Sequence, residues 1–231
     1  MVNCYLVGDV LVDAGTPGAR RRLLRQLSGR SLSAHVVTHA HPDHFGSSRA
    51  VCEALDLPLW CGAKDAEAIE TARPVIGPGR VPRLLARLPT PPSYAVSRGL
   101  VEGDEVAGFE VLDVPGHSPG HVALWRESDR VLIAGDVFFH LGRRVSAPWS
   151  FLTADVAVNR ASMKRLAALR PALALFGHGP PLRDPDVLAQ VSPARHGDGL
   201  TANGAGIHDP AGTALGHHHV GGGHGGHQVL V

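Results

Sequence analysis

Thr38-His39-Ala40-His41-Pro42-Asp43-His44, residues 38–44, places four side chains that can bind a metal ion within one short run. The run follows a β-branched segment at 34–37, which is typical of a buried strand, and precedes a segment at 45–55 with helical spacing. Loops held by rigid elements are common positions for functional residues. We interpret this stretch as half of a two-metal hydrolytic site.

Three further potential ligands follow other predicted strands, each beside a glycine or proline that shapes a tight turn. They are His117 after a strand at 109–114, Asp136 after a strand at 130–134, and His178 after a strand at 172–176. The resulting set of five histidines and two aspartates is too large for one zinc, which takes three or four protein ligands. It suits two metal ions roughly 3.5 to 4 Å apart that share a carboxylate and a bridging hydroxide. Histidine and carboxylate without thiolate suit Zn, Fe or Mn.

The rest of the chain alternates short strands and helices. Strands are predicted at 2–7, 10–13, 34–38, 57–61, 109–114, 121–125, 130–134 and 172–176. Helices are predicted at 17–27, after His44, at 63–71, at 155–169 and at 184–191. The strand, helix, strand order between residues 34 and 61 predicts a parallel crossover, whereas Gly8-Asp9 predicts a hairpin turn.

Two segments depart from this pattern. Residues 73–97 carry six prolines and predict a loop or partly helical insertion, either one wall of a substrate pocket or a plain surface excursion. Residues 192–231 are rich in glycine and histidine, with too few apolar side chains to offset their ordering entropy. We expect a hydrolase domain at 1–191 and a disordered tail at 192–231, which either binds Zn or Ni weakly or has no role.

Composition narrows the possible partners. Of 231 residues, 44% are hydrophobic and 19% charged, which is typical of a folded globular protein. The formal charge of +1, without a basic run that would track a phosphate backbone, argues against a nucleic-acid partner. Cys4, Cys52 and Cys61 form no CxxC pair, which favours buried thiols in a reducing compartment. Without an export segment or a membrane span, the expected location is the cytoplasm.

Three other histidines have weaker claims to the site. His35 lies inside a predicted strand, out of phase with the motif, and is expected to be structural or on the surface. His121 is expected to support a ligand or to pack rather than to bind metal directly. His140 follows Asp136 by four residues on a loop that could face the pocket, so it is a candidate for substrate contact.

Four motifs together carry a family resemblance. They are His39-x-His41-x-Asp43-His44, the turn at 115–121 around His117, Gly135-Asp136, and Gly177-His178-Gly179. In these motifs and their order, the chain resembles the metallo-β-lactamase-fold hydrolases, and most of all the glyoxalase II-like branch. The resemblance implies an α+β fold, an αββα sandwich of two mixed β-sheets flanked by helices, with the site at one edge.

The resemblance also implies an assignment of ligands. One metal ion would be held by His39, His41 and His117, the second by Asp43, His44 and His178, and Asp136 would bridge the two. Two cations lower the pKa of a bound water from about 16 toward 7, so that hydroxide exists at neutral pH. Asp43 has a second, catalytic role if it also steers the nucleophile by hydrogen bonding.

We expect a metal-dependent hydrolase, with two divalent ions and Zn favoured, whose bridging hydroxide cleaves a small-molecule thioester, lactone or related ester. Glyoxalase II carries a helical C-terminal domain that helps to bind glutathione, and residues 192–231 do not match it. Three alternatives stay open. They are a phosphodiesterase or nuclease-like hydrolase, a persulfide dioxygenase-like enzyme with a single iron, and a non-hydrolytic metal-binding protein on the same fold.

Overall fold

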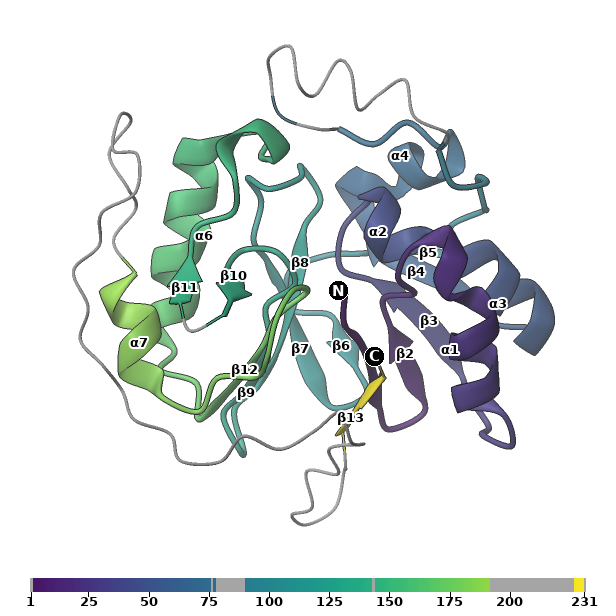
Figure 1. Ribbon diagram of the computed structural model, residues 1–231, viewed down its shortest axis with the longest axis horizontal. Helices are drawn as coiled ribbons and strands as arrows, with labels where there is room; N and C mark the ends of the chain where they lie inside the picture. The colour runs from purple at the N-terminus through teal and green to yellow at the C-terminus, as the bar shows by residue number, and fades with distance from the viewer. Residues whose placement is uncertain (1, 76, 78–89, 143, 192–226, 231) are drawn as a thin grey trace.

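Two mixed β-sheets pack face to face in the computed structural model, which describes residues 2–75, 77, 90–142, 144–191 and 227–230 (Figure 1). The first sheet has the strand order β13-β1-β2-β3-β4-β5. Its strands are β1 (Cys4–Val7), β2 (Val10–Val12), β3 (Ala34–Val37), β4 (Leu59–Gly62), β5 (Arg98–Leu100) and β13 (His227–Leu230). The second sheet has the order β12-β9-β8-β7-β6. Its strands are β6 (Glu105–Val106), β7 (Phe109–Asp113), β8 (Val122–Arg126), β9 (Val131–Ile133) and β12 (Leu173–Leu175).

Both sheets mix parallel and antiparallel pairs. β1 and β2 form the predicted antiparallel hairpin, and β2 to β5 run parallel to one another. The parallel pairing of β3 with β4 confirms the crossover predicted from their order along the chain. In the second sheet β12 pairs parallel with β9, whereas β9, β8, β7 and β6 pair antiparallel.

Helices cover the outer face of each sheet, which gives four layers (Figure 1). Those of the first half are the 3-10 turn η1 (Pro17–Ala19), α1 (Arg20–Leu27), α2 (Pro42–Phe45), α3 (Ser48–Leu55), η2 (Ala63–Asp65) and α4 (Ala66–Glu70). Those of the second half are η3 (Ser150–Leu152), α6 (Val156–Ala168) and α7 (Pro185–Gln190). The αββα sandwich expected from the sequence is confirmed.

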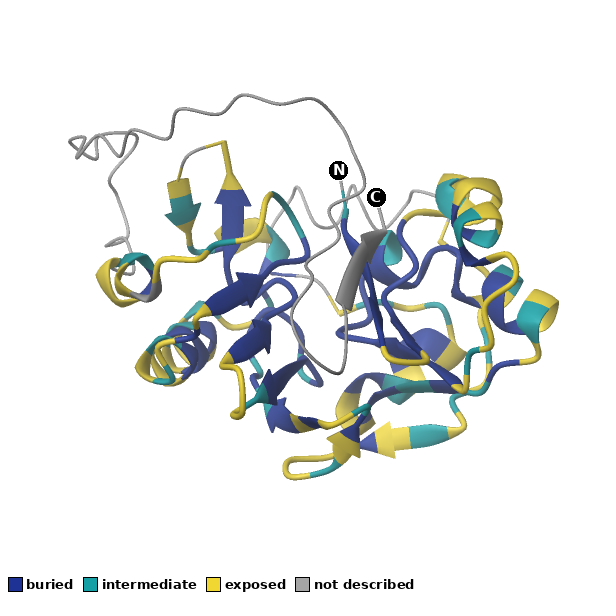
Figure 2. Ribbon diagram, turned by 90° about the horizontal axis from the view of Figure 1, so that it is seen from below, coloured by how far each residue is buried: buried dark blue, intermediate teal, exposed yellow. Residues whose placement is uncertain are grey.

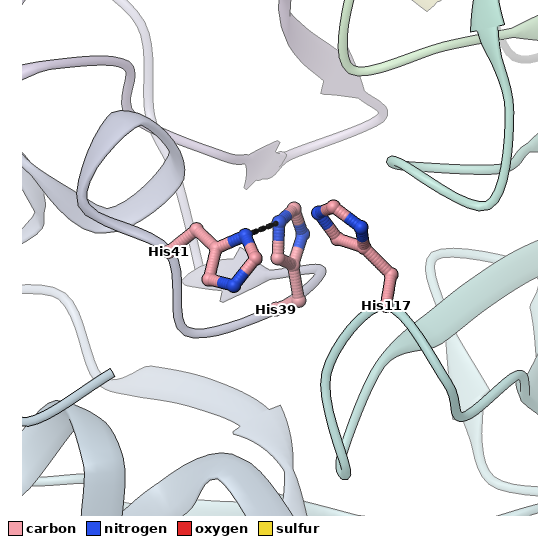
Figure 3. Close-up of side chains that lie close together, drawn as sticks. All are labelled: His39, His41 and His117. Carbon is pink, nitrogen blue, oxygen red and sulfur yellow. Dashed lines mark hydrogen bonds between the residues drawn. The ribbon is translucent and has the colours of Figure 1, made fainter. Parts of the chain in front are cut away.

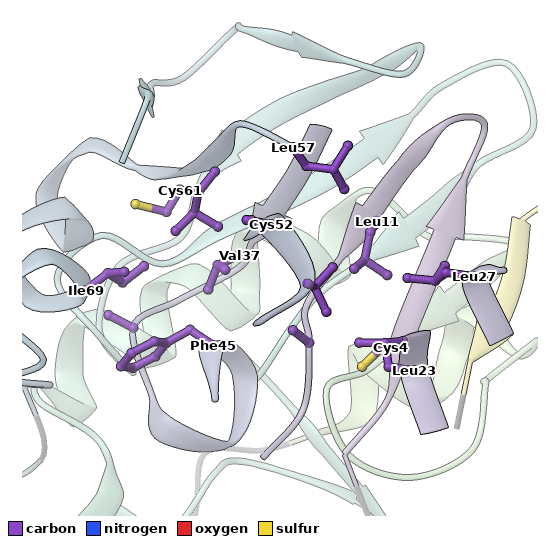
Figure 4. Close-up of a cluster of buried hydrophobic side chains, with 14 of the residues drawn as sticks. Cys4, Leu11, Leu23, Leu27, Val37, Phe45, Cys52, Leu57, Cys61 and Ile69 are labelled. Carbon is purple, nitrogen blue, oxygen red and sulfur yellow. The ribbon is translucent and has the colours of Figure 1, made fainter. Parts of the chain in front are cut away.

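The alternation of side chains along the strands explains why both faces of each sheet are apolar. Val10 and Val12 face the opposite sheet, whereas Leu11 between them packs against the helices. Leu23 and Leu27 of α1 reach the same helix-facing core as Leu11 (Figure 4). Burying one such leucine contributes roughly 1.5 to 3 kcal/mol to stability. The central strands are therefore almost entirely buried, and the exposed residues lie mainly on the helices, the turns and the short strands such as β5 and β6 (Figure 2).

Several elements were not predicted from the sequence. β5 continues the first sheet beyond β4, and β10 (Phe139–Leu141) pairs with β11 (Arg144–Ser146) as a separate ribbon. β13 pairs antiparallel with β1, so residues 227–230 do not follow the prediction of a disordered tail. Residues 192–226 of that tail, and 78–89 of the proline-rich segment, lie outside the described residues. The described part of 73–97 forms no helix or strand, which agrees with the loop of the two forms expected there, a loop or a partly helical insertion.

No helix in the described part of the chain is both long and apolar enough to cross a membrane.

Candidate metal centre

All seven predicted ligands meet where strands from both sheets end. They are His39 and His41 after β3, Asp43 and His44 in α2, His117 after β7, Asp136 after β9, and His178 after β12. Their possible ligand atoms form three groups in which all atoms lie within 4.8 Å of one another. The first group is His39, His41 and His117, and the second group is Asp43, His44 and His178. The remaining group, His39, His44 and Asp136, shares a histidine with each of these two.

The first group consists of three buried rings that point toward one another (Figure 3). His39 Nε2 and His41 Nδ1 are 3.1 Å apart. On its far side His41 Nε2 donates to the carbonyl oxygen of Val75, and His39 Nδ1 lies 3.1 Å from the Thr38 hydroxyl. That hydroxyl donates to Asp13, so it accepts from His39. The proton of the His41 ring is therefore on Nε2 and that of the His39 ring on Nδ1. The two nitrogens that face each other, His39 Nε2 and His41 Nδ1, carry lone pairs.

His117 completes this group with a third lone pair. Its Nδ1 lies 3.4 Å from the Thr153 hydroxyl, which donates to the Trp149 carbonyl and so accepts from the ring. Its Nε2 is buried and has no hydrogen-bond partner among the described residues. Burial, and then the neighbouring histidines, lower the pKa of His39 and His117 well below the usual value, which keeps these rings neutral. Neutral imidazoles with converging lone pairs are the form that binds a metal ion.

The second group combines two histidines with a carboxylate. His178 Nε2 lies 3.2 Å from Asp43 Oδ2, and His44 Nε2 lies 3.9 Å from the same oxygen. Burial alone lowers the pKa of His44, but the carboxylates of Asp136, Asp13 and Asp43 outweigh it and raise that pKa well above the usual value. Burial likewise lowers the pKa of His178, yet hydrogen bonds to Asp136 and Asp43 raise it to about 9. This part of the site strongly favours positive charge.

Asp136 lies between the two groups. Its Oδ2 is 3.9 Å from His39 Nε2, 3.5 Å from His117 Nε2, 3.3 Å from His44 Nε2 and 3.2 Å from His178 Nε2. Burial raises the pKa of this carboxyl, but His44, His178 and His117 outweigh it and hold that pKa well below the usual range. Asp136 is therefore a buried anion that faces histidines of both groups.

The spacing of the possible ligand atoms is compatible with bound divalent cations. Neighbouring ligand atoms of a tetrahedral zinc with bonds near 2.0 to 2.1 Å lie roughly 3.4 Å apart. The facing nitrogens of His39 and His41 are 3.1 Å apart, and the distances from Asp136 Oδ2 to the histidine nitrogens around it are 3.2 to 3.9 Å. These distances agree with the spacing of zinc ligands. His44 Nε2, His117 Nε2 and Asp136 Oδ1 are buried without a hydrogen-bond partner in the described part of the chain. Such groups are costly unless a ligand satisfies them.

Two glycines make room for the ligands. A Cβ on Gly177, beside His178, would overlap Asp136 Oδ1 and lie 2.6 Å from His44 Cε1. Gly116, beside His117, has a φ of +126°, and a Cβ there would overlap the backbone of Asn159 in α6. The glycines that flank the ligands in the sequence are therefore required by close packing.

Two aspartates that position the ligands were missed by the sequence analysis. Asp13 follows β2, adopts a φ of +60°, and its Oδ2 accepts from His44 Nδ1 at 2.8 Å. Its Oδ1 accepts from the Thr38 backbone N–H at 2.8 Å. The signal that identified Asp136, an acidic residue at a strand end near a glycine, was also present at Asp13.

Asp65 gave no comparable signal. Its buried carboxylate accepts from the Ala40 N–H at 2.8 Å, from the Ser118 hydroxyl at 2.6 Å and from the Gly120 N–H at 2.6 Å. Ala40 lies between His39 and His41, and Ser118 follows His117. Asp65 therefore ties together the loops that carry the first group.

The three histidines with weaker claims to the site have hydrogen-bonding roles. His35 is buried, donates to the Leu11 carbonyl at 3.1 Å and accepts from the Ser48 hydroxyl at 2.8 Å, which confirms that it is structural. His121 Nε2 accepts from the Asp136 backbone N–H at 3.2 Å, in agreement with the expected supporting role.

The ring of His140 donates to the Pro180 carbonyl at 2.7 Å, while its backbone N–H donates to the His178 carbonyl. His140 therefore holds the His178 loop, and its contact with a substrate stays a prediction.

Comparisons with known proteins identify a family and several relatives of this chain. The family model described as the metallo-beta-lactamase superfamily matches residues 1–178. The probable metallo-hydrolase YflN of Bacillus subtilis is 29% identical over 201 residues, covering 75% of this chain and 76% of the relative. The hydroxyacylglutathione hydrolase GloC of Haemophilus influenzae is 28% identical over 148 residues, covering 61% and 68%. The crystal structure of TTHA1623 in a di-iron-bound form is 32% identical with a TM-score of 0.64, covering 83% of this chain and 94% of that one.

Proposed function

We propose that this chain, which belongs to the metallo-beta-lactamase superfamily, is a binuclear metal-dependent hydrolase of the glyoxalase II-like type. Its substrate would be a small-molecule thioester, lactone or related ester. The observation that carries this proposal is the position of Asp136 Oδ2, within 3.9 Å of histidines from both ligand groups. One metal ion takes three or four protein ligands, so a mononuclear site would leave one of the two ligand groups without a metal ion.

The proposed ligands are divided between the two ions. His39, His41 and His117 would hold the first, Asp43, His44 and His178 the second, and Asp136 would contact both. When bound, two such cations supply a water of lowered pKa and polarise the scissile carbonyl oxygen. Hydrolysis then forms a C–O bond to the acyl carbon and breaks its bond to sulfur or oxygen. The leaving atom takes a proton.

The residues of the chain have distinct tasks in this proposal. Asp13 accepts a hydrogen bond from His44 Nδ1. This bond fixes the proton of the neutral ring on Nδ1, so the lone pair of Nε2 faces the site. Asp43 is the most exposed of the ligands that carry an acidic group, with 38% of its side chain accessible against 3% for Asp136. It is therefore placed to orient an attacking water by accepting a hydrogen bond, in addition to binding metal.

Zinc is the metal we propose, since neutral imidazole and carboxylate without thiolate suit it. Iron is the specific alternative, because the relative TTHA1623 is described in a di-iron-bound form.

Three free, buried cysteines are consistent with a proposed cytoplasmic location.

A substrate panel tests the proposed activity. The purified protein, loaded separately with Zn, Fe and Mn, would be assayed against thioesters, lactones, β-lactams and phosphodiesters. We expect thioester or lactone hydrolysis that disappears on chelation and returns with the metal. Activity that survives chelation at a verified metal content near zero would contradict the proposal.

The persulfide dioxygenase-like alternative makes a different prediction. It needs one iron, which leaves Asp43, His44 and His178 without metal. Oxygen consumption with a persulfide substrate, at one iron per chain, would favour it over hydrolysis. Phosphodiester cleavage in the panel would favour the nuclease-like alternative, and inactivity on every ester would favour a metal-binding role.

A further inference from the structure

A row of aromatic side chains runs from the metal centre to the surface. The Phe139 ring lies edge-on to His178, with centroids 5.0 Å apart, and to His117 at 6.1 Å. It also contacts the Trp149 ring at 5.6 Å, and Trp149 stacks on Phe151 at 5.7 Å with an interplanar angle of 10°. Phe139 is 3% exposed, Trp149 53% and Phe151 37%. The apolar surface thus begins at two proposed ligands and ends in solvent.

The segment 149–154, which carries Trp149 and Phe151, is held against the metal site by hydrogen bonds. Thr153 follows η3, and its hydroxyl donates to the Trp149 carbonyl while accepting from the His117 ring. The Ala154 N–H donates to the His117 carbonyl at 3.2 Å. The positions of Trp149 and Phe151 are therefore coupled to a ligand of the first group.

A pocket of about 430 Å³ adjoins the row. It is lined by Ser150, Phe151, Thr153, Ala154, Asp155, Val156 and Ala157. No lysine or arginine is among these described residues. Asp155 supplies the only charge, and its carboxylate caps α6 by accepting from the N–H groups of Ala157 and Val158.

The start of the proline-rich segment lies against the same loop. The backbone of Gly77 is so close that a Cβ there would lie 2.7 Å from the Thr153 carbonyl oxygen and 2.8 Å from that of Phe151. Two residues earlier, Val75 accepts a hydrogen bond from His41 and leaves 45% of its own surface exposed. Val75 thus adds apolar surface beside the first ligand group.

We propose that Trp149 and Phe151 bind an apolar group, aryl or medium-length alkyl, attached to the scissile ester or thioester. This inference rests on the proposed hydrolytic function. An exposed, stacked aromatic pair is unusual unless it contacts a ligand, because apolar surface in water is costly. Phe139 makes the surface continuous with His117 and His178, so a bound chain leads to the reacting atoms. The carboxylate of Asp155 and the absence of a cation from the described lining disfavour an anionic group in this pocket.

Two matched substrate series test the proposal and locate the apolar group. In one, thioesters of a single polar thiol carry acetyl, butanoyl, hexanoyl or phenylacetyl groups. In the other, acetyl thioesters carry leaving thiols of increasing apolar size. We expect kcat/KM to rise about 10-fold from acetyl to hexanoyl, or across the leaving-group series, which corresponds to about 1.4 kcal/mol.

Trp149→Ala and Phe151→Ala should abolish this rise, mainly through KM, so that kcat/KM falls about 10-fold more on the hexanoyl or most apolar substrate than on the acetyl thioester. Val101→Ala is the matched control, because Val101 is 52% exposed in the turn before β6. A rise that persists in both variants, or an equal loss on every substrate, would overturn the proposal.

A binding measurement separates this proposal from the hydrolytic one. The metal-loaded protein is titrated with butyrate and with 4-phenylbutyrate, and tryptophan fluorescence is followed. We expect tighter binding of 4-phenylbutyrate that Phe151→Ala abolishes. If no ester is hydrolysed but this difference holds, the function fails and the apolar subsite stands. If esters are hydrolysed with flat profiles and both acids bind equally, the subsite fails and the function stands.

Discussion

Asp65 joins the two loops that carry the first ligand group. Its two oxygens accept three hydrogen bonds, from Ala40, Ser118 and Gly120, and it is 1% exposed. An asparagine has one acceptor oxygen, so Asp65→Asn would turn an amide N–H toward a buried donor. Each buried group left unsatisfied costs roughly 1 to 3 kcal/mol.

We therefore predict that Asp65→Asn weakens metal affinity about 10- to 100-fold, the range found for groups that orient ligands. Competition with a chromophoric chelator measures this affinity. Asp56→Asn is the control, since Asp56 is exposed at the C-terminal end of α3. Equal affinity in both variants would show that Asp65 does not position the metal ligands.

His35 predicts a pH dependence of stability away from the metal site. Burial, offset in part by the Leu11 carbonyl and by Asp13, lowers its pKa from 6.5 to about 4. Between these values the unfolded chain binds the proton and the folded chain does not. Its contribution to stability is therefore present above pH 6.5 and lost as the pH falls toward 4, by at most about 3 kcal/mol.

The asparagine variant tests this linkage, because His35→Asn retains a donor for Leu11 but does not titrate. Urea unfolding of the metal-free protein between pH 4 and 7 gives the free energy of unfolding of both forms. We predict that the wild type loses more stability than the variant below pH 6.5. Parallel curves would show that His35 is not linked to folding.

At the scale of elements, the ends of strands decide where the chemistry lies. The ligands at these ends could be predicted because each follows the end of a strand within seven residues and lies near a glycine or proline in the sequence. Asp65 could not, because its role depends on donors from Ala40, Ser118 and Gly120, which only folding brings together. The short strands β5, β10 and β11 were missed because three residues show too little alternation to be distinguished from a loop.

The junction after β12 gives a prediction at this scale. Gly177 has an ordinary φ, so the alanine backbone is allowed, but the added methyl group would overlap Asp136 and approach His44. Gly177→Ala should therefore reduce metal content by at least one ion per chain and activity more than about 100-fold.

Gly18→Ala is the matched control, since a Cβ on Gly18 meets only the Thr16 hydroxyl at 3.9 Å. Metal content and circular dichroism of the two variants separate a damaged site from a damaged fold. Full metal content in a folded Gly177→Ala protein would contradict the proposed crowding.

At the scale of the whole molecule, the centre joins the two halves of the sandwich. The loops of the first sheet supply His39, His41, Asp43 and His44, and those of the second supply His117, Asp136 and His178. Because the unfolded chain does not hold these ligands together, metal binding stabilises the folded state by linkage. Free metal at 100 times its Kd would contribute about 2.7 kcal/mol.

We predict that chelation lowers the Tm and that added Zn restores it in proportion to the logarithm of the free metal concentration. Calorimetry across a zinc-buffer series measures the effect. A Tm that does not depend on the free metal concentration would show that metal binding does not stabilise the folded state.

The central claim is a centre for two metal ions, and elemental analysis of the metal-loaded protein tests it most directly. We predict two ions per chain in the wild type. His41→Ala and His178→Ala, one from each ligand group, should each retain about one. One ion in the wild type, unchanged by His178→Ala, would contradict the binuclear centre and the hydrolytic function built on it.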